Sequence, residues 1–379
     1  MHNPFESFWM AGFECTDQLN AFGNRVDFLQ ITGHLERTNE DYKNLDLFQI
    51  RTVREGIRWS QVEVQPYQYN WSSVGSMLQS AAISNVQVIW DLCHFGYPDD
   101  LTPLHPHFTA RFCALCRAFV HFYRSMRPTE TLIVTPINEV GFISWLGGDV
   151  AGTAPYCKGN GWEVKYALMR AYIKGVEVLK SCDPAIRILT TEPLVNIVEP
   201  LCATDEQREK AQLLHLNQFQ VTDMLSGSLC PELGGQKDYL DIIGCNYYYN
   251  NQWVSDSFEA LHWLNLAQDS RWNTLSNLLE AIYLRYQRPL VLSETSHPGE
   301  DRPVWIEFIA EECSKLLQKQ VPLWGICWYP AVDRPDWDHL YPWHRSGLWD
   351  IPDSVTKNRI LHLPSANALS RAQGLLQKK

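Results

Sequence analysis

The stretch TLIVTPINE, residues 131–139, is a short β-rich apolar run that ends in two polar side chains, Asn138 and Glu139. Seven further runs of this kind recur along the chain, separated by longer stretches whose apolar residues are spaced three and four apart. Strands that alternate with helices predict parallel βαβ units, and eight such units are the number that closes a barrel. The sequence therefore predicts the α/β class, with a single (β/α)8 TIM barrel. The predicted strands are Trp9–Phe13, Thr52–Trp59, Val86–Leu92, Thr131–Ile137, Ile186–Thr191, Leu240–Cys245, Pro289–Leu292 and Leu323–Trp328, and the helical patterns include Phe108–Tyr123, Glu163–Ser181, Leu275–Tyr286 and Pro303–Lys319.

The length and composition suit one large barrel domain. The 379 residues are 45% hydrophobic and 20% charged, which allows a sizeable core and argues against disorder. We expect residues 1–379 to form one domain, with 365–379 as a peripheral C-terminal helix or tail. The many aromatic residues supply bulk to a core and, in a cleft, flat faces that can stack on sugar rings.

The overall charge and the cysteine usage limit the partners and the location. A formal net charge of −11, with no basic stripe, argues against binding of nucleic acid. No run approaches the ~18 apolar residues of a membrane span. The N-terminal residues lack the basic and apolar regions of a signal peptide, and the 11 cysteines are scattered and odd in number. Free thiols and a cytoplasmic location are therefore expected.

Short motifs for metals and nucleotides are weak or absent. Cys113 and Cys116 form a C-x-x-C inside a helical pattern with no second pair, which favours a buried helix face over a zinc or redox site. His105 and His107 lack a third ligand, which favours a surface loop. No phosphate-binding glycine motif follows a strand. We therefore expect neither a metal nor a cofactor.

Polar and aromatic side chains follow six of the predicted strands, at the end where barrel enzymes place their active sites. They are Arg54 and Trp59 after the second strand, Asp91 and His94 after the third, Asn138 and Glu139 after the fourth, Asn246, Tyr247 and Tyr248 after the sixth, Glu294 after the seventh and Trp328 after the eighth. This recurrence on one side predicts a polar site at the barrel mouth.

Glu139 and Glu294 are the candidate catalytic carboxylates. A retaining glycosidase needs an acid and a nucleophile about 5–5.5 Å apart, and the fourth and seventh strands of a barrel face each other. Arg54 is expected to keep Glu294 ionised, and a tyrosine hydroxyl from the sixth strand is expected to donate to it. Burial and repulsion should keep Glu139 protonated, so that the pair titrates as a unit. Asn138 is placed to bind the sugar 2-hydroxyl.

These segments resemble the motifs of glycoside hydrolase family 1, the β-glucosidase family of clan A, in the right order through nearly the whole chain. The segments are FWMAGFECTDQ (8–18), VREGIRW (53–59), LCHFGYP (92–98), TPINEV (135–140, similar to T-x-N-E-P), LDIIGCNYY (240–248), PLVLSETS (289–296), and Trp328 with the later HRSGLWD (344–350). The resemblance implies a TIM barrel, a retaining mechanism, β-linked sugars and no cofactor. It further implies that the sugar contacts are Gln18, His94, Asn246 and Trp328, with Arg54 and Tyr248 supporting the catalytic pair.

The sequence also departs from the family pattern. Val140 replaces the proline after the acid, and Thr295 and Ser296 replace Asn-Gly after the nucleophile. The family's late Glu-Trp pair, which grips the sugar 4- and 6-hydroxyls, corresponds to Asp336 and Trp337, with one extra residue before it. Because Asp is one methylene shorter than Glu, we expect that side of the sugar pocket to be reshaped.

Three further carboxylates are candidates for the site, and two of them have two interpretations each. Asp91 lines the pocket or pairs with an arginine of the second strand, and Glu14 is an extra site carboxylate or part of a salt bridge at the barrel mouth. Glu192 ends the fifth strand, where it could touch an aglycone. Glu55 and Glu63 are predicted to be structural. Tyr247, Tyr249, Trp337 and Trp343 are candidates for walls that stack on sugars.

The sequence thus predicts a retaining exo-β-glycosidase that acts on a carbohydrate or glycoside by double displacement. Two alternatives stay open. One is a transglycosidase that uses the same site, and the other is a sugar-binding pseudoenzyme, because a fold does not guarantee an activity.

Overall fold

The computed structural model describes residues 2–264 and 269–377, and its centre is a closed barrel of eight parallel strands. In barrel order the strands are β1 (Trp9–Gly12), β2 (Thr52–Gly56), β5 (Gln87–Asp91), β6 (Ile133–Thr135), β7 (Arg187–Pro193), β9 (Ile242–Asn246), β11 (Leu290–Thr295) and β12 (Leu323–Trp328). Each strand overlaps the run predicted for it. The predicted TIM barrel is therefore confirmed.

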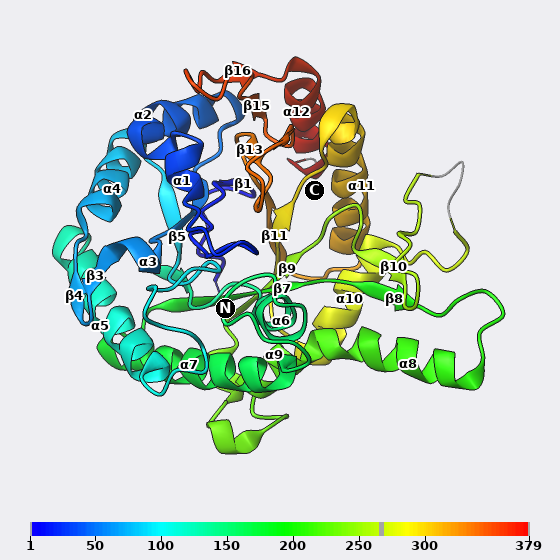
Figure 1. Cartoon of the computed structure of the whole chain (residues 1–379). Helices are drawn as coiled ribbons and strands as arrows, with labels where there is room; N and C mark the ends of the chain where they lie inside the picture. Colours follow the sequence, from blue (N-terminus) through cyan, green and yellow to red (C-terminus); the bar gives the residue numbers. More distant parts are fainter. Residues whose placement is uncertain (1, 265–268, 378–379) are drawn as a thin grey trace.

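Helices ring the barrel (Figure 1), and the four predicted helical patterns correspond to α5, α7, α10 and α11. The helices are α1 (Phe28–Ile31), α2 (His34–Asn44), α3 (Trp59–Val62), α4 (Ser72–Ser84), α5 (Phe108–Met126), α6 (Val140–Ser144), α7 (Gly161–Cys182), α8 (Asp205–Leu216), α9 (Gln220–Leu225), α10 (Leu275–Tyr286), α11 (Arg302–Gln318) and α12 (Leu363–Gln377). The C-terminal helix α12 lies against α11 and buries Ala368 and Leu369. The C-terminal segment is thus a docked helix outside the barrel.

The barrel interior is filled by one apolar residue from each of seven strands. These residues are Met10, Ile89, Ile133, Leu189, Ile242, Val291 and Cys327, all buried. Strand β2 differs, because it presents the buried Arg54 in register with Ile89. A guanidinium group therefore stands where an apolar side chain would complete the layer, and a buried charge needs partners close by.

The second strand is shorter than predicted. It ends at Gly56, and Arg58 takes the left-handed conformation (φ 60°) before α3 begins at Trp59. The Trp59 ring is fully buried and its indole N–H donates to Glu63 at 2.5 Å. Trp59 is therefore a core residue at the start of α3. The prediction that it ends the second strand was wrong.

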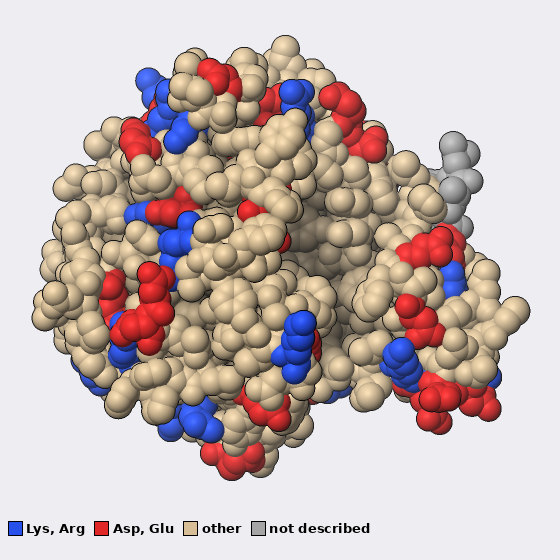
Figure 2. Space-filling model, in the orientation of Figure 1, with Lys and Arg blue, Asp and Glu red and all other residues tan. Residues whose placement is uncertain are grey.

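An extension lies beside the barrel mouth on the side of β7 and β9. Strands β8 (Asn196–Val198) and β10 (Gln252–Val254) pair in parallel there, next to α8. Figure 1 shows this extension outside the helix ring, and Figure 2 shows a hollow in the surface beside it. In the described part of the chain no helix has the length and apolar character that crossing a bilayer requires.

Five two-residue strands and one three-residue strand form three small antiparallel pairs in the described part of the chain. Strand β3 (Glu63–Gln65) pairs with β4 (Gln68–Tyr69), β13 (Arg334–Pro335) with β14 (Trp343–His344), and β15 (Trp349–Asp350) with β16 (Ile360–Leu361). The β13–β14 pair follows β12 and carries the segment of Asp336 and Trp337.

Candidate active site

Glu294 lies at a bulge near the end of β11. Its neighbours pair so that Ser293 and Glu294 together oppose a single residue, Asn246, on β9. A bulge at a barrel rim redirects side chains, and here the Glu294 carboxylate reaches two donors. Arg54 Nη1 donates to Oε1 at 2.5 Å and Tyr248 Oη donates to Oε2 at 2.7 Å. Glu294 is thus bound by an arginine and by a tyrosine that follows the sixth strand of the barrel, as the sequence predicted.

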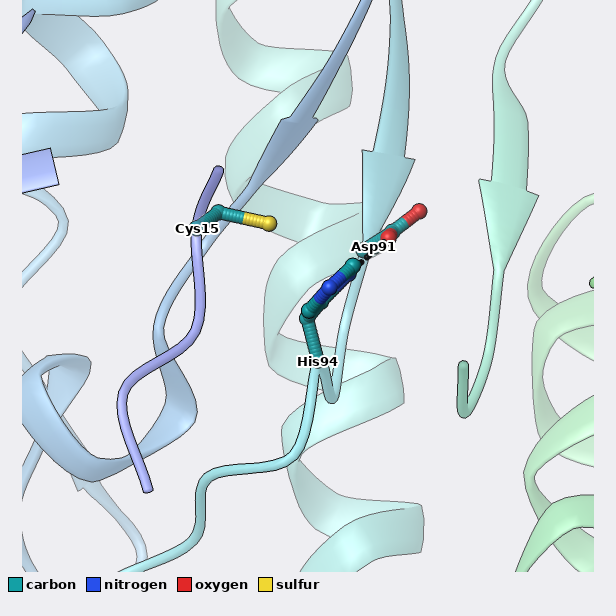
Figure 3. A group of neighbouring side chains, drawn as sticks. All are labelled: Cys15, Asp91 and His94. Carbon is teal, nitrogen blue, oxygen red and sulfur yellow. Dashed lines mark hydrogen bonds and ion pairs between the residues drawn. The ribbon is translucent and has the colours of Figure 1, made fainter. Parts of the chain in front are cut away.

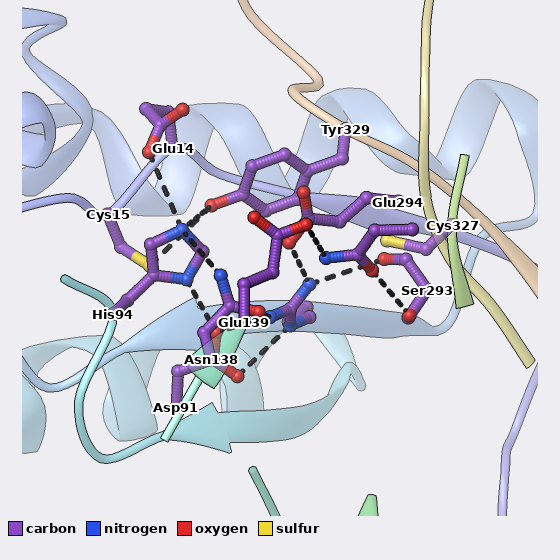
Figure 4. A network of polar contacts seen from close by, with 12 residues as sticks. Glu14, Cys15, Asp91, His94, Asn138, Glu139, Ser293, Glu294, Cys327 and Tyr329 are labelled. Atoms are coloured by element: carbon purple, nitrogen blue, oxygen red, sulfur yellow. Dashed lines mark hydrogen bonds and ion pairs between the residues drawn. The ribbon is translucent and has the colours of Figure 1, made fainter. Parts of the chain in front are cut away.

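Arg54 holds together the cluster that we call the mouth network, which consists of Arg54, Asp91, His94, Asn138 and Glu294 (Figure 4). Its guanidinium donates to both Asp91 oxygens, at 3.0 and 2.7 Å, and to Asn138 Oδ1 at 2.6 Å. The paired-arginine interpretation of Asp91 is therefore correct. Burial raises the pKa of Asp91, but the charge of Arg54 and the His94 hydrogen bond outweigh burial and lower it. This fixed fork orients Asn138 and Glu294 relative to each other.

Glu139 faces this network from the end of β6 (Figure 4), where its backbone is left-handed (φ 44°). A non-glycine residue with positive φ is strained, and such strain is concentrated at functional sites. Its carboxylate Oε1 accepts a hydrogen bond from the Asn246 amide at 2.8 Å. Burial and then the negative charge of Glu294 raise its pKa well above the ordinary value. The two glutamates thus have different surroundings, because Glu294 meets an arginine and Glu139 meets a neutral amide.

Asn246 is itself held in place. The Ser293 hydroxyl donates to Asn246 Oδ1 at 2.6 Å, which leaves the amide N–H₂ to face Glu139. Sequence reasoning missed Ser293. The available signal was its position next to Glu294, since a bulge there turns both side chains toward the mouth.

His94 lies between two carboxylates. Its Nδ1 is 2.7 Å from Asp91 Oδ2, and its Nε2 is 3.7 Å from Glu14 Oε1. Burial lowers the pKa of His94, but the hydrogen bond and charge of Asp91 outweigh burial and raise it. Glu14 also meets Arg334 at 3.3 Å. Glu14 therefore satisfies both of its interpretations, because it is a salt-bridge partner that also borders the site.

Tyr329 is a site residue that sequence reasoning missed. Its ring stacks on His94 with the centroids 5.8 Å apart, and its hydroxyl is 3.3 Å from His94 Nε2 (Figure 4). A Cβ on Gly12 would lie 2.1 Å from this ring, so only glycine permits the ring to enter the barrel. The signal in the sequence was that Tyr329 directly follows Trp328 at the end of β12.

Cys15, Asp91 and His94 place three potential metal ligands within 4.8 Å of one another (Figure 3). The donors are already used, because Asp91 is bound by Arg54 and His94, and the Cys15 thiol contacts the Tyr329 hydroxyl at 3.7 Å. Burial and the neighbouring carboxylates raise the Cys15 pKa well above its ordinary value, which disfavours the thiolate that a metal needs. With the Arg54 cation also bonded to Asp91, this cluster fits a positioning network better than a metal site.

Two residues expected to bind sugar carry unpaired polar atoms. Gln18 Oε1 and Trp337 Nε1 are buried and have no hydrogen-bond partner. Because buried polar groups normally have partners, these atoms are free to meet a ligand. Trp337 packs on Phe95, and Arg334 lies over its ring at 5.7 Å.

Two other residues predicted to contact the sugar, Asp336 and Trp328, have polar groups that bind other parts of the protein. Asp336 Oδ1 accepts the amides of Asp338 and His339, so this carboxylate holds its own turn. Trp328 is fully buried, and its indole N–H donates to the Ser346 carbonyl at 3.0 Å. The structure brings neither residue into the mouth network.

Two aromatic candidates differ in their burial. Tyr247 is fully buried, stacks on Trp305 and accepts a hydrogen bond from Gln252 at 2.9 Å, so its predicted role as a stacking wall was wrong. Tyr249 stays partly exposed beside His297, with ring centroids 4.4 Å apart. Trp343, also partly exposed, lies in β14 opposite Pro335.

The other carboxylates and short motifs have structural surroundings. Glu192 is directed to the backbone amide of Gly141 at 2.9 Å, on the outer side of β6 and β7, in place of the aglycone contact predicted for it. Glu63 pairs with Arg111, as expected of a structural residue. Cys116 is buried on α5, and His105 and His107 are exposed on the loop before it.

Solved structures with the same fold exist, but comparison of the sequence alone finds no match. No family model matches the chain, and no curated protein matches it. The family 1 β-glucosidase from Thermotoga maritima superposes with a TM-score of 0.74 over 99% of this chain and 98% of that chain, at 14% identity. The same enzyme in complex with glucoimidazole matches with a TM-score of 0.74 and 14% identity over 91% and 88%. The AHE enzyme from Alicyclobacillus herbarius matches with 0.72 and 14% over 91% and 88%. At this identity the likeness establishes the fold.

Proposed function

We propose that this protein is a retaining exo-β-glycosidase in which Glu294 is the nucleophile and Glu139 the general acid and base. One observation carries the proposal. Two glutamates face each other at one barrel mouth, and Glu294 is bonded to Arg54 and Tyr248 whereas Glu139 is bonded only to the neutral amide of Asn246. The likeness of the fold to β-glucosidases with bound inhibitors supports it.

In the first step an ionised oxygen of Glu294 attacks the anomeric carbon, and the bond from that carbon to the leaving oxygen breaks. Glu139 gives its proton to the leaving oxygen, so the aglycone departs as a neutral alcohol. Arg54 and Tyr248 hold the attacking carboxylate in one orientation, which lowers the entropic part of the barrier.

In the second step Glu139, now ionised, takes a proton from water while the water oxygen attacks the anomeric carbon. The bond to Glu294 breaks, its carboxylate is restored, and the configuration at the sugar is retained after two inversions. Asn138, fixed by Arg54, is the group proposed to bind the sugar 2-hydroxyl, where contacts strengthen in the transition state.

The test is covalent labelling by a panel of activated 2-fluoro β-glycosides that differ in sugar configuration. The expected result is one equivalent of label on the peptide that contains Glu294, with loss of activity toward the matching aryl glycoside. Glu300→Gln is the matched control, because Glu300 is exposed on the segment after the same strand. This variant should take up the label on Glu294 as the wild type does.

Other outcomes separate the alternatives. Tight sugar binding with neither label nor turnover would identify a sugar-binding pseudoenzyme. Label on Glu294 together with transfer of the sugar to an added alcohol in preference to water would identify a transglycosidase. Label on a residue other than Glu294 would overturn the assignment of the nucleophile.

A further inference from the structure

Glu192 is a buried carboxylate directly behind Glu139 that the proposed reaction does not use. It lies on β7, next in sequence to Thr191, whose carbonyl accepts the amide of Glu139 at 2.9 Å. Leu189 of the same strand faces the barrel interior, and side chains alternate along a strand, so Glu192 points away from the interior toward α6 and α7. It is 9% exposed.

The Glu192 carboxylate binds the first turn of α6, which begins directly after Glu139. Its Oε2 accepts the Gly141 amide at 2.9 Å, and both this amide and that of Val140 lower the pKa of Glu192. These amides are among the N–H groups that have no partner inside a helix, and a carboxylate is the partner that a helix N-terminus favours. A Cβ on Gly141 would lie 2.7 Å from the same oxygen, so glycine is needed for this approach.

This contact acts on the backbone that carries Glu139. Glu139 is the residue before α6 and has φ 44°, a conformation that persists only where the surroundings hold it. Its own side chain makes no capping bond to α6. The Glu192 carboxylate supplies that bond from the neighbouring strand, which leaves the Glu139 carboxylate free to face the mouth network.

We propose that Glu192 is a positioning residue for Glu139: its carboxylate fixes the strained turn that carries Glu139 and places a third acidic group beside the two glutamates of the mouth. This inference rests on the acid role proposed for Glu139. Glu192 would then be the third carboxylate, after Glu294 and Glu139, that influences proton transfer at the site.

The electrostatic surroundings support the proposal. The groups that face Glu139 are Glu294, Glu192, Arg54, Tyr248 and the Asn246 amide. The charge of Glu192 raises the pKa of Glu139, after the larger effects of burial and Glu294.

Glu192 has charged and polar neighbours of its own on α7. Burial raises the pKa of Glu192 to about 7, although the Gly141 amide and the charge of Lys165 lower it. The Tyr172 hydroxyl is buried without a hydrogen-bond partner, and burial together with the charge of Glu192 raises its pKa. The pKa values of both Glu139 and Glu192 are thus raised, and burial is the largest cause for each.

The experiment compares Glu192→Gln, Glu192→Ala and the control Glu209→Gln, which removes an exposed carboxylate from α8. The first readout is the titration of Glu139 by NMR of protein with ¹³C-labelled glutamate side chains, assigned by the loss of its signal in Glu139→Gln. Glu192→Gln should shift the Glu139 titration to lower pH by about 0.5–1 unit, because a neighbouring negative charge is removed. Glu209→Gln should leave it unchanged.

The second readout is hydrogen exchange of the Gly141 amide. Glu192→Ala should accelerate it about tenfold or more, because the acceptor is lost, whereas the glutamine amide oxygen should retain most of the protection. An unmoved Glu139 titration in Glu192→Gln, or Gly141 exchange in Glu192→Ala equal to that of the wild type, would overturn the proposal. Neither readout needs turnover, so a wild-type protein that hydrolyses no glycoside would contradict the proposed function and leave this inference to be decided separately.

Discussion

Two neighbouring residues of β2 lead to two buried charge clusters on opposite faces of the same strand. Arg54 points into the barrel and centres the mouth network. Glu55 points outward into a cluster that we call the wall network, made of His34, Asp41, Tyr42, Glu55 and Arg359. Side chains alternate along a strand, which is why one residue of separation divides the clusters.

The side chains of the wall network are buried. His34 Nδ1 is 2.7 Å from Asp41 and Nε2 is 2.8 Å from Glu55, while Arg359 binds both oxygens of Asp41 at 2.8 Å. The Phe13 ring stacks on the imidazole at 3.8 Å between centroids. Each member has at least one partner from β2, α2 or the C-terminal segment, although Glu55 Oε2 accepts no hydrogen bond.

The mouth network is built from similar residue types, but it is bordered by Glu139. This carboxylate is partly exposed and receives one amide hydrogen bond. A cluster that is buried throughout stabilises the fold, whereas one that borders a partly exposed carboxylate is suited to a ligand. This difference predicts that variants of the mouth network lose activity and variants of the wall network lose stability.

The largest expected effect is on activity. Glu294→Ala should reduce kcat for an aryl β-glycoside by about 10⁴-fold or more, because the nucleophile is removed. Azide should restore part of the turnover and give a product of inverted configuration. The free energy of unfolding should change by less than about 2 kcal/mol, since Arg54 keeps Asp91 as a partner.

The measurements are steady-state kinetics and urea denaturation of the same preparations. Glu300→Ala, which removes an exposed carboxylate from the loop after β11, is the control for both and should resemble the wild type. Activity of Glu294→Ala close to that of the wild type would remove the proposed distinction between the networks.

The next effect is on stability. His34→Leu should lower the free energy of unfolding by about 3–5 kcal/mol, because Glu55 would lose its buried cationic partner. Activity per folded molecule should stay within about twofold of the wild type. His105→Leu, the same change at an exposed histidine, is the control for urea denaturation. A loss of activity without a loss of stability would contradict the comparison.

A smaller effect concerns pH and the same histidine. Burial lowers the pKa of His34, but Glu55 and the hydrogen bond to Asp41 outweigh burial and raise it from 6.5 to about 9. Because the folded state holds this proton more tightly, its contribution is complete below about pH 6.5 and is lost as the pH rises through about 9. At 1.36 kcal/mol per pKa unit, the loss amounts to about 3 kcal/mol.

This effect is measured as the free energy of unfolding of the wild type minus that of His34→Leu at several pH values from 6 to 10. The charged and polar groups facing His34 are Asp41, Glu55 and Tyr42. The difference should shrink as the pH rises. A difference that is constant over this range would show that His34 is neutral in the folded protein.

The smallest effect is expected from metal removal and from Cys15. Dialysis against a chelator, and the Cys15→Ala substitution, should each change activity by less than about twofold, because Asp91 and His94 are already bonded to protein groups. Metal content by mass spectrometry should be far below one equivalent. One equivalent of a divalent metal, lost together with activity, would make the mouth network a metal site.

The sequence determined much of this molecule by itself. The apolar runs gave the eight strands, because burial on both faces selects β-branched and apolar residues, and the strand ends gave Arg54, Asp91, Asn138, Glu139 and Glu294. Neighbouring side chains of a strand point to opposite faces, so Arg54 and Glu55 lie on different sides of β2. A structural role was predicted for Glu55. These features depend only on local periodicity and on the order of the strands.

Tertiary structure decided what lies beyond the strand ends, where periodicity no longer fixes a side-chain direction. It buried Tyr247, for which a place in the sugar pocket was predicted, and it made the Asp336 carboxylate an acceptor for the amides of its own loop. It also joined Glu192 to Gly141, 51 positions apart, and Arg359 to Asp41, 318 apart. Such pairs depend on how distant segments close around the barrel, so their contacts follow from the packing of the whole chain.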